Sequence, residues 1–73
     1  MGKKYNFSKL NGKIVEIFGT QLAFAEAIGL SEMTISKKMN GKRPWKQTDM
    51  AKACEVLGIP IAEIPAYFFA TDV

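Results

Sequence analysis

The sequence predicts an all-α protein, a compact bundle of about five short helices. Apolar side chains recur three and four residues apart in several segments, which is the spacing of one helix face. Glycines and hydroxyl-bearing side chains bound most of these segments, as expected of helix ends. The chain has 73 residues, so these helices form one small domain with a core of limited size.

The amino-terminal end is expected to be a flexible arm, residues 1–6, followed by the helical domain, residues 7–69. Residues 70–73 are expected to form a short tail. Ser8 can cap a first helix, and Gly19 can end it. The inward stripe of this helix consists of Leu10, Ile14, Ile17 and Phe18.

The next stretch, residues 20–41, predicts two short helices joined by a tight turn, a helix-turn-helix. Thr20 can cap the first helix, and Gly29 can end it because glycine adopts a positive φ at little cost. Ser31 can cap the second helix, which is expected to start near Glu32. The inward positions of the two helices are Phe24, Ala25, Ile28, Ile35 and Met39.

A charged loop, residues 41–46, separates this motif from a fourth helix at about residues 47–57. Gly58 can end that helix. Two roles remain open for Trp45 in the loop: it plugs the core beside the fourth helix, or it contacts a DNA backbone.

The carboxyl-terminal segment, residues 59–69, is densely apolar and contains two prolines. Pro60 is expected near the start of a short fifth helix and Pro65 at or just past its end. The large apolar side chains exceed what so small a domain is expected to cover, so they either form a dimer contact or fold back to complete the core. The candidates for a dimer interface are Ile61, Ile64, Tyr67, Phe68 and Phe69.

The formal net charge of +3 is distributed unevenly. A ten-residue stretch that starts in the second helix of the motif contains only bases among its charged residues: Lys37, Lys38, Lys42, Arg43 and Lys46. Such a cluster suits contact with phosphates, and the alternative is a solvated helix face. Acids outnumber bases beyond Asp49, which suits contact of that end with protein.

The composition also argues against several classes of protein. Cys54 is the single cysteine and there is no histidine, so neither a zinc finger nor a cysteine-histidine nucleophile pair can be assembled. We therefore expect no enzymatic activity, metal, cofactor or small-molecule substrate. Since the single Cys54 can form no intramolecular disulfide, we expect a cytoplasmic protein. No apolar run approaches the length of a membrane span.

The motif contains a characteristic series of residues, which in chain order are Gln21, Ala25, Gly29, Ile35, Asn40 and Gly41. This order resembles the helix-turn-helix of the phage Cro/repressor family, also called XRE-type. The resemblance extends over roughly residues 5–69, and it implies a lambda-repressor-like DNA-binding domain whose motif is formed by the second and third helices.

This resemblance implies a Cro-like repressor of phage or prophage origin, binding a double-stranded DNA operator as a homodimer. The helix from about Glu32 to Met39 would lie in the major groove. The residues expected to contact bases are Glu32, Met33, Ser36 and Lys37. The residues expected to contact phosphates are Thr20, Gln21, Lys38, Asn40, Lys42, Arg43 and Lys46.

A second hypothesis is a small phage modulator or antirepressor that binds a partner repressor protein. Glutamate at position 32 can accept a hydrogen bond from cytosine, but it also repels nearby phosphates. An exposed Met33 beside Glu32 suits a protein contact at least as well as a phosphate-lined groove, and so does the aromatic tail.

Overall fold

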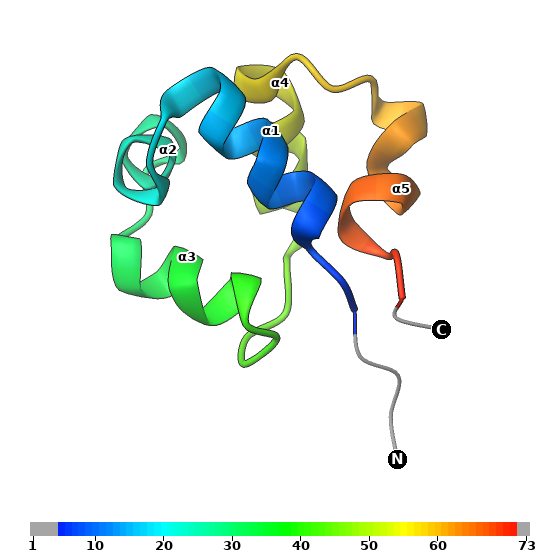
Figure 1. The fold of residues 1–73 in the computed structure, drawn as a ribbon, viewed down its shortest axis with the longest axis horizontal. Coiled ribbons are helices and arrows are strands. Elements are labelled where there is room, and N and C mark those ends of the chain that lie inside the picture. The colour runs from blue at the N-terminus through cyan, green and yellow to red at the C-terminus, as the bar shows by residue number, and fades with distance from the viewer. Residues whose placement is uncertain (1–4, 72–73) are drawn as a thin grey trace.

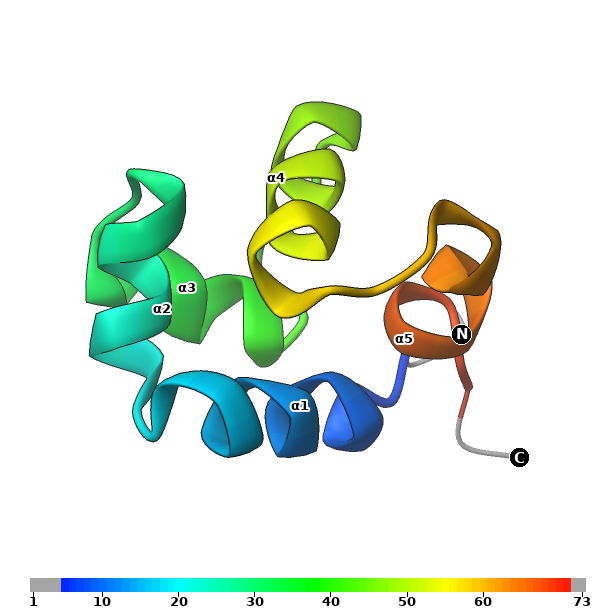
Figure 2. The same cartoon turned by 90° about the horizontal axis from the view of Figure 1, so that it is seen from above.

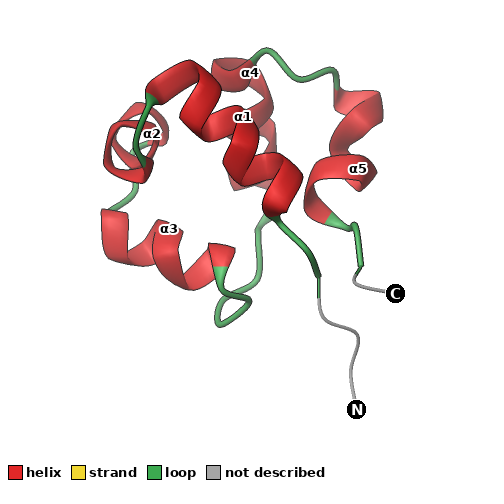
Figure 3. Cartoon of the chain, viewed as in Figure 1, coloured by secondary structure: helices red, strands yellow, loops and turns green. Residues whose placement is uncertain are grey.

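In a computed structural model that describes residues 5–71, the chain folds into five α-helices and one short 3-10 helix (Figure 1). The described residues contain helices and loops and no extended strand (Figure 3). The predicted all-α bundle is therefore confirmed. The elements are α1 (Ser8–Phe18), α2 (Gln21–Ile28), α3 (Glu32–Met39), α4 (Gln47–Leu57), η1 (Ile61–Glu63) and α5 (Ile64–Phe68).

The long helix α1 connects the two ends of the molecule. It contacts α2 at one end, α4 in the middle and α5 at the other end, and α4 stands over it in Figure 2. The core lies between these helices, and its largest fully buried side chains are Leu10, Ile14, Phe24, Ile35 and Phe68. None of the helices among residues 5–71 is long and apolar enough to cross a membrane.

The helix-turn-helix forms as predicted, because its caps satisfy the free amides at both helix starts. The Thr20 hydroxyl oxygen accepts a hydrogen bond from the Ala23 N–H at 3.1 Å, and the Ser31 hydroxyl oxygen accepts one from the Thr34 N–H at 3.2 Å. Gly29 ends α2 with a φ of +77°, a backbone conformation that residues with a Cβ rarely adopt.

The start of α1 differs from the prediction. Ser8 is the first helical residue rather than its cap, and its N–H donates to the Asn6 side-chain oxygen at 2.8 Å. The last turn of α1 also differs from the prediction, because Ile17, which was expected to face inward, is 46% exposed. Phe18 covers the core there instead, with its ring 5.8 Å from that of Phe24.

The two ends of the described chain pair with each other. The Asn6 N–H donates to the Ala70 carbonyl oxygen at 2.7 Å, and Tyr5 and Thr71 form an isolated antiparallel bridge. The last residues of the predicted arm are thus joined to the start of the predicted tail. The remainder of both, residues 1–4 and 72–73, lies outside the described residues.

The prediction that Pro65 ends the fifth helix is wrong, since Pro65 lies in the first turn of α5. Proline suits that position because its φ is already helical and a first-turn amide has no acceptor within the helix. The helix therefore begins later and turns Tyr67 and Phe68 into the core.

Candidate protein-interaction surface

The solvent-facing side of α3 combines an acid with an apolar side chain. Glu32 and Met33 are exposed, Met33 by 69%, while Ser36 and Lys37 are half-buried. Ile35 points into the core and fixes which side of the helix faces outward. These four outward residues are the ones predicted to contact bases, and their shared position on α3 is as expected.

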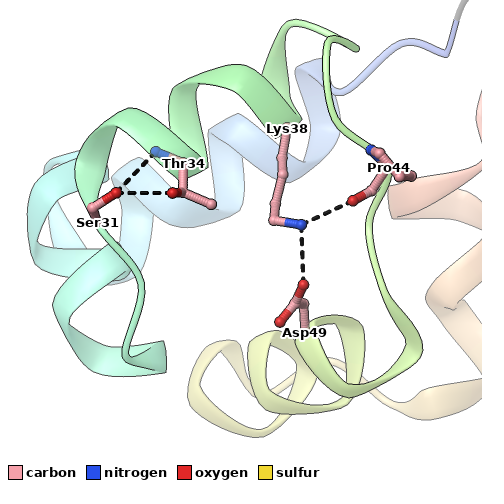
Figure 4. A network of polar contacts seen from close by, with 5 residues as sticks. All are labelled: Ser31, Thr34, Lys38, Pro44 and Asp49. Atoms are coloured by element: carbon pink, nitrogen blue, oxygen red, sulfur yellow. Dashed lines mark hydrogen bonds and ion pairs between the residues drawn. The ribbon is translucent and has the colours of Figure 1, made fainter.

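Lys38 is not available for the phosphate contact predicted for it. Its side chain crosses from α3 toward α4, where its ammonium lies 3.0 Å from an Asp49 carboxylate oxygen (Figure 4). It also donates to the Pro44 carbonyl oxygen at 2.8 Å, and the residue is only 4% exposed. A buried charge is costly unless it has polar partners, and this ammonium finds them in the loop after α3 and in α4. Lys38 therefore links α3, that loop and α4.

The other predicted phosphate contacts fall into two groups. Thr20 is engaged in capping α2, and the Gln21 side-chain amide donates to the Asn11 side-chain oxygen at 3.2 Å. The remaining four residues are exposed at the carboxyl-terminal cap of α3 and in the loop that follows it, namely Asn40, Lys42, Arg43 and Lys46.

A groove with a volume of about 710 Å³ lies where the loop after α3 meets the two paired chain ends. We call it the aromatic groove, since half of its lining residues are aromatic. It is lined by Tyr5, Phe7, Met39, Asn40, Gly41, Arg43, Pro44, Trp45, Phe68 and Phe69. Residues from three distant parts of the sequence therefore form one surface.

Edge-to-face contacts hold the aromatic side chains of this groove in place. The Trp45 ring is 5.0 Å from Phe68 at 72°, and the Tyr5 ring is 5.8 Å from Phe69, also at 72°. Tyr5 and Phe69 nevertheless remain 50% and 46% exposed. Exposed aromatic rings on a small, rigid scaffold are typical of protein-binding sites.

Trp45 packs against the core, which confirms the first of its two predicted roles. Its ring contacts Phe7 and Phe68, and the Lys38 ammonium lies 5.6 Å from the ring centre. The indole N–H is buried and has no hydrogen-bond partner among residues 5–71.

The predicted dimer interface is only partly exposed in the structure. Tyr67 and Phe68 belong to the core, so their assignment to a dimer contact is wrong. They fold back because α5 packs on α1 and α4 and turns these two side chains toward the core. Ile64 is half-buried, while Ile61 and Phe69 are exposed.

The amino-terminal part of the aromatic groove was not predicted from the sequence. Tyr5 fell within the predicted arm, and neither it nor Phe7 was expected to be part of a site. A signal was present, because the alternation of Tyr5 and Phe7 places both rings on one side of an extended segment. Their pairing with the chain's other end was not predictable from local pattern.

The sequence matches, over residues 3–71, the family described as "Protein of unknown function (DUF739)". The chain belongs to this family. No curated protein matches this DUF739 protein. It is similar to the solution structure of the modulator of repression (MOR) of the temperate bacteriophage TP901-1 from Lactococcus lactis. The identity is 51%, the TM-score is 0.80, and the match covers 89% of this chain and 88% of that chain.

These findings correct the assignment to the Cro/repressor (XRE-type) family, which is wrong. They also overturn the prediction of a Cro-like DNA-binding repressor, because the similar structure is a modulator of repression. The motif residues that carried the resemblance specify how two helices pack, through Ala25, Gly29 and Ile35, and not what the outer face binds.

Proposed function

We propose that this DUF739 protein modulates transcription by binding a phage repressor protein. The observation that carries the proposal is the 51% identity, over almost the whole chain, to the TP901-1 modulator of repression. Identity of this extent, with a TM-score of 0.80, indicates that the two chains share a fold. The proposal agrees with the second of the two hypotheses drawn from the sequence.

The surface proposed for this contact is the aromatic groove, with the exposed side of α3 as its extension. Tyr5 and Phe69 offer large, half-exposed rings that are already fixed by each other, so little side-chain entropy is lost on binding. Met33 lies seven residues before Asn40 of the groove lining, which is about two helical turns, so the two positions share one side of the helix roughly 10 Å apart. One partner can therefore contact the groove and the start of α3 together.

The experiment is a titration of the purified repressor encoded by the same genome into this protein, followed by calorimetry. We expect a stoichiometric complex in the absence of DNA. Phe69→Ala is expected to weaken the complex by about 1–2 kcal/mol, because an aromatic anchor at the centre of an interface carries much of the binding energy.

Ile61→Ala is the matched control, since Ile61 is 74% exposed but lies on η1, outside the aromatic groove. The affinity of the Ile61→Ala variant for the repressor is expected to equal that of the unchanged protein. Thermal melting of both variants checks that they fold. If the repressor does not bind, or if Phe69→Ala binds as tightly as Ile61→Ala, the proposal or its placement in the groove is wrong.

A further inference from the structure

The two walls of the aromatic groove differ in chemical character. One wall is apolar and consists of side chains from the paired chain ends and α5: Tyr5, Phe7, Phe68 and Phe69. The other wall is formed by the end of α3 and the following loop, and its charged member is Arg43. No acidic residue is among those that line the groove.

The basic character extends beyond Arg43. Residues 33–48 include no acid, and the nearest one, Asp49, is held by Lys38. Lys42 and Arg43 are exposed, and neither has an ion pair among the described residues. A positive potential that the chain itself does not neutralise therefore borders an apolar groove.

We infer that the aromatic groove binds an acidic amphipathic segment of the partner protein, with large apolar side chains against the aromatic wall and a carboxylate on Arg43. The inference rests on the proposed function and specifies the chemistry of the partner. A guanidinium matches a carboxylate through two parallel hydrogen bonds. An apolar stripe beside acids is what an amphipathic helix lying in a groove presents.

The geometry favours protein over single-stranded nucleic acid as the occupant. Bases bind by stacking flat on exposed ring faces. Here the exposed rings of Tyr5 and Phe69 meet edge to face at 72°, so one ring face of the pair is already covered. The groove is also lined by Phe7, Met39 and Trp45, which are buried or half-buried. They provide an apolar surface against which side chains of a partner protein can pack.

The test uses a displayed library of random 12-residue peptides selected on the immobilised full chain. The expected result is enrichment of peptides that combine Asp or Glu with Leu, Ile, Phe or Trp. An enriched peptide is then titrated into the protein while the fluorescence of Trp45, the single tryptophan, is followed. The Arg43→Glu variant is expected to bind that peptide about tenfold more weakly.

Lys52→Glu is the matched control, because it makes the same change in net charge at an exposed position of α4 outside the aromatic groove. Its peptide affinity is expected to change less than twofold. The inference is overturned by an empty selection, by enrichment of basic or uncharged peptides, or by equal losses in Arg43→Glu and Lys52→Glu. Displacement of the peptide by oligothymidine would favour nucleic acid instead.

The outcome separates this inference from the proposed function. If the repressor binds while no acidic peptides are selected, the function stands and the inference fails. If acidic apolar peptides bind the groove while the repressor does not, the groove chemistry is right and the identity of the partner is wrong.

Discussion

Replacing Lys38 by methionine is expected to destabilise the protein strongly. Methionine keeps an unbranched stem of similar length but lacks the ammonium that lies 3.0 Å from Asp49 and donates to Pro44. The carboxylate of Asp49, whose side chain is only 13% exposed, is then left without a partner. Pro44, in the loop after α3, also loses the hydrogen bond that its carbonyl oxygen accepts from Lys38.

The expected cost is about 3–5 kcal/mol, the range for removing one member of a buried ion pair. A domain of 73 residues has a total stability of about 4–11 kcal/mol. The loss is thus a large share of the total. The double variant Lys38→Met with Asp49→Leu is expected to recover most of it, because neither charge is then buried alone.

Urea unfolding, followed by circular dichroism and by Trp45 fluorescence, measures these differences. Lys13→Met is the control, since Lys13 lies 3.9 Å from the exposed Glu16 in a pair at the surface of α1. Such a pair contributes roughly 0–1 kcal/mol. Equal losses for Lys38→Met and Lys13→Met, or a double variant less stable than Lys38→Met, would refute the role given to this ion pair.

Other substitutions test the turn and the core. Ser31→Ala removes the α3 cap and is expected to cost about 1 kcal/mol in urea unfolding, whereas no loss would contradict the cap. Gly29→Ala is expected to cost about 1–2 kcal/mol through its φ of +77°, with Gly12→Ala, inside α1, as a control that does not lower stability. Burial raises the pKa of the Cys54 thiol, so the unfolded chain loses this proton first and stability falls as the pH rises through the thiol range. A Cys54→Ala variant with the same alkaline slope would contradict this, as would rapid reaction of native Cys54 with a disulfide reagent.

Local patterns predicted most of the fold. Thr20, Gly29 and Ser31 fixed the bounds of α2 and α3 because caps and positive-φ glycines act within a few residues. The prediction for the fourth helix was confirmed by α4 for the same reason, with Gly58 at its end. Pro65 misled the prediction because a proline suits both the residue after a helix and its first turn.

The candidate site was less predictable, because it depends on contacts between residues far apart in the sequence. Tyr5 and Phe69 are 64 positions apart and meet only after both chain ends pair beside α5. Lys38 belongs to a run of bases that looks uniform in the sequence, yet it alone reaches Asp49 and is buried. The charge pattern of the sequence does not distinguish a buried, ion-paired lysine from an exposed one.

Binding of a repressor through the aromatic groove can be tested most directly by nuclear magnetic resonance. Unlabelled repressor is titrated into the ¹⁵N-labelled protein, and the amide shifts are mapped on the structure. We expect the largest changes at Tyr5, at residues 39–45 and at Phe69, which border the aromatic groove. Changes confined to the opposite surface of α2 and α4, around Glu26 and Lys52, or no changes at all, would contradict binding of a repressor through this groove.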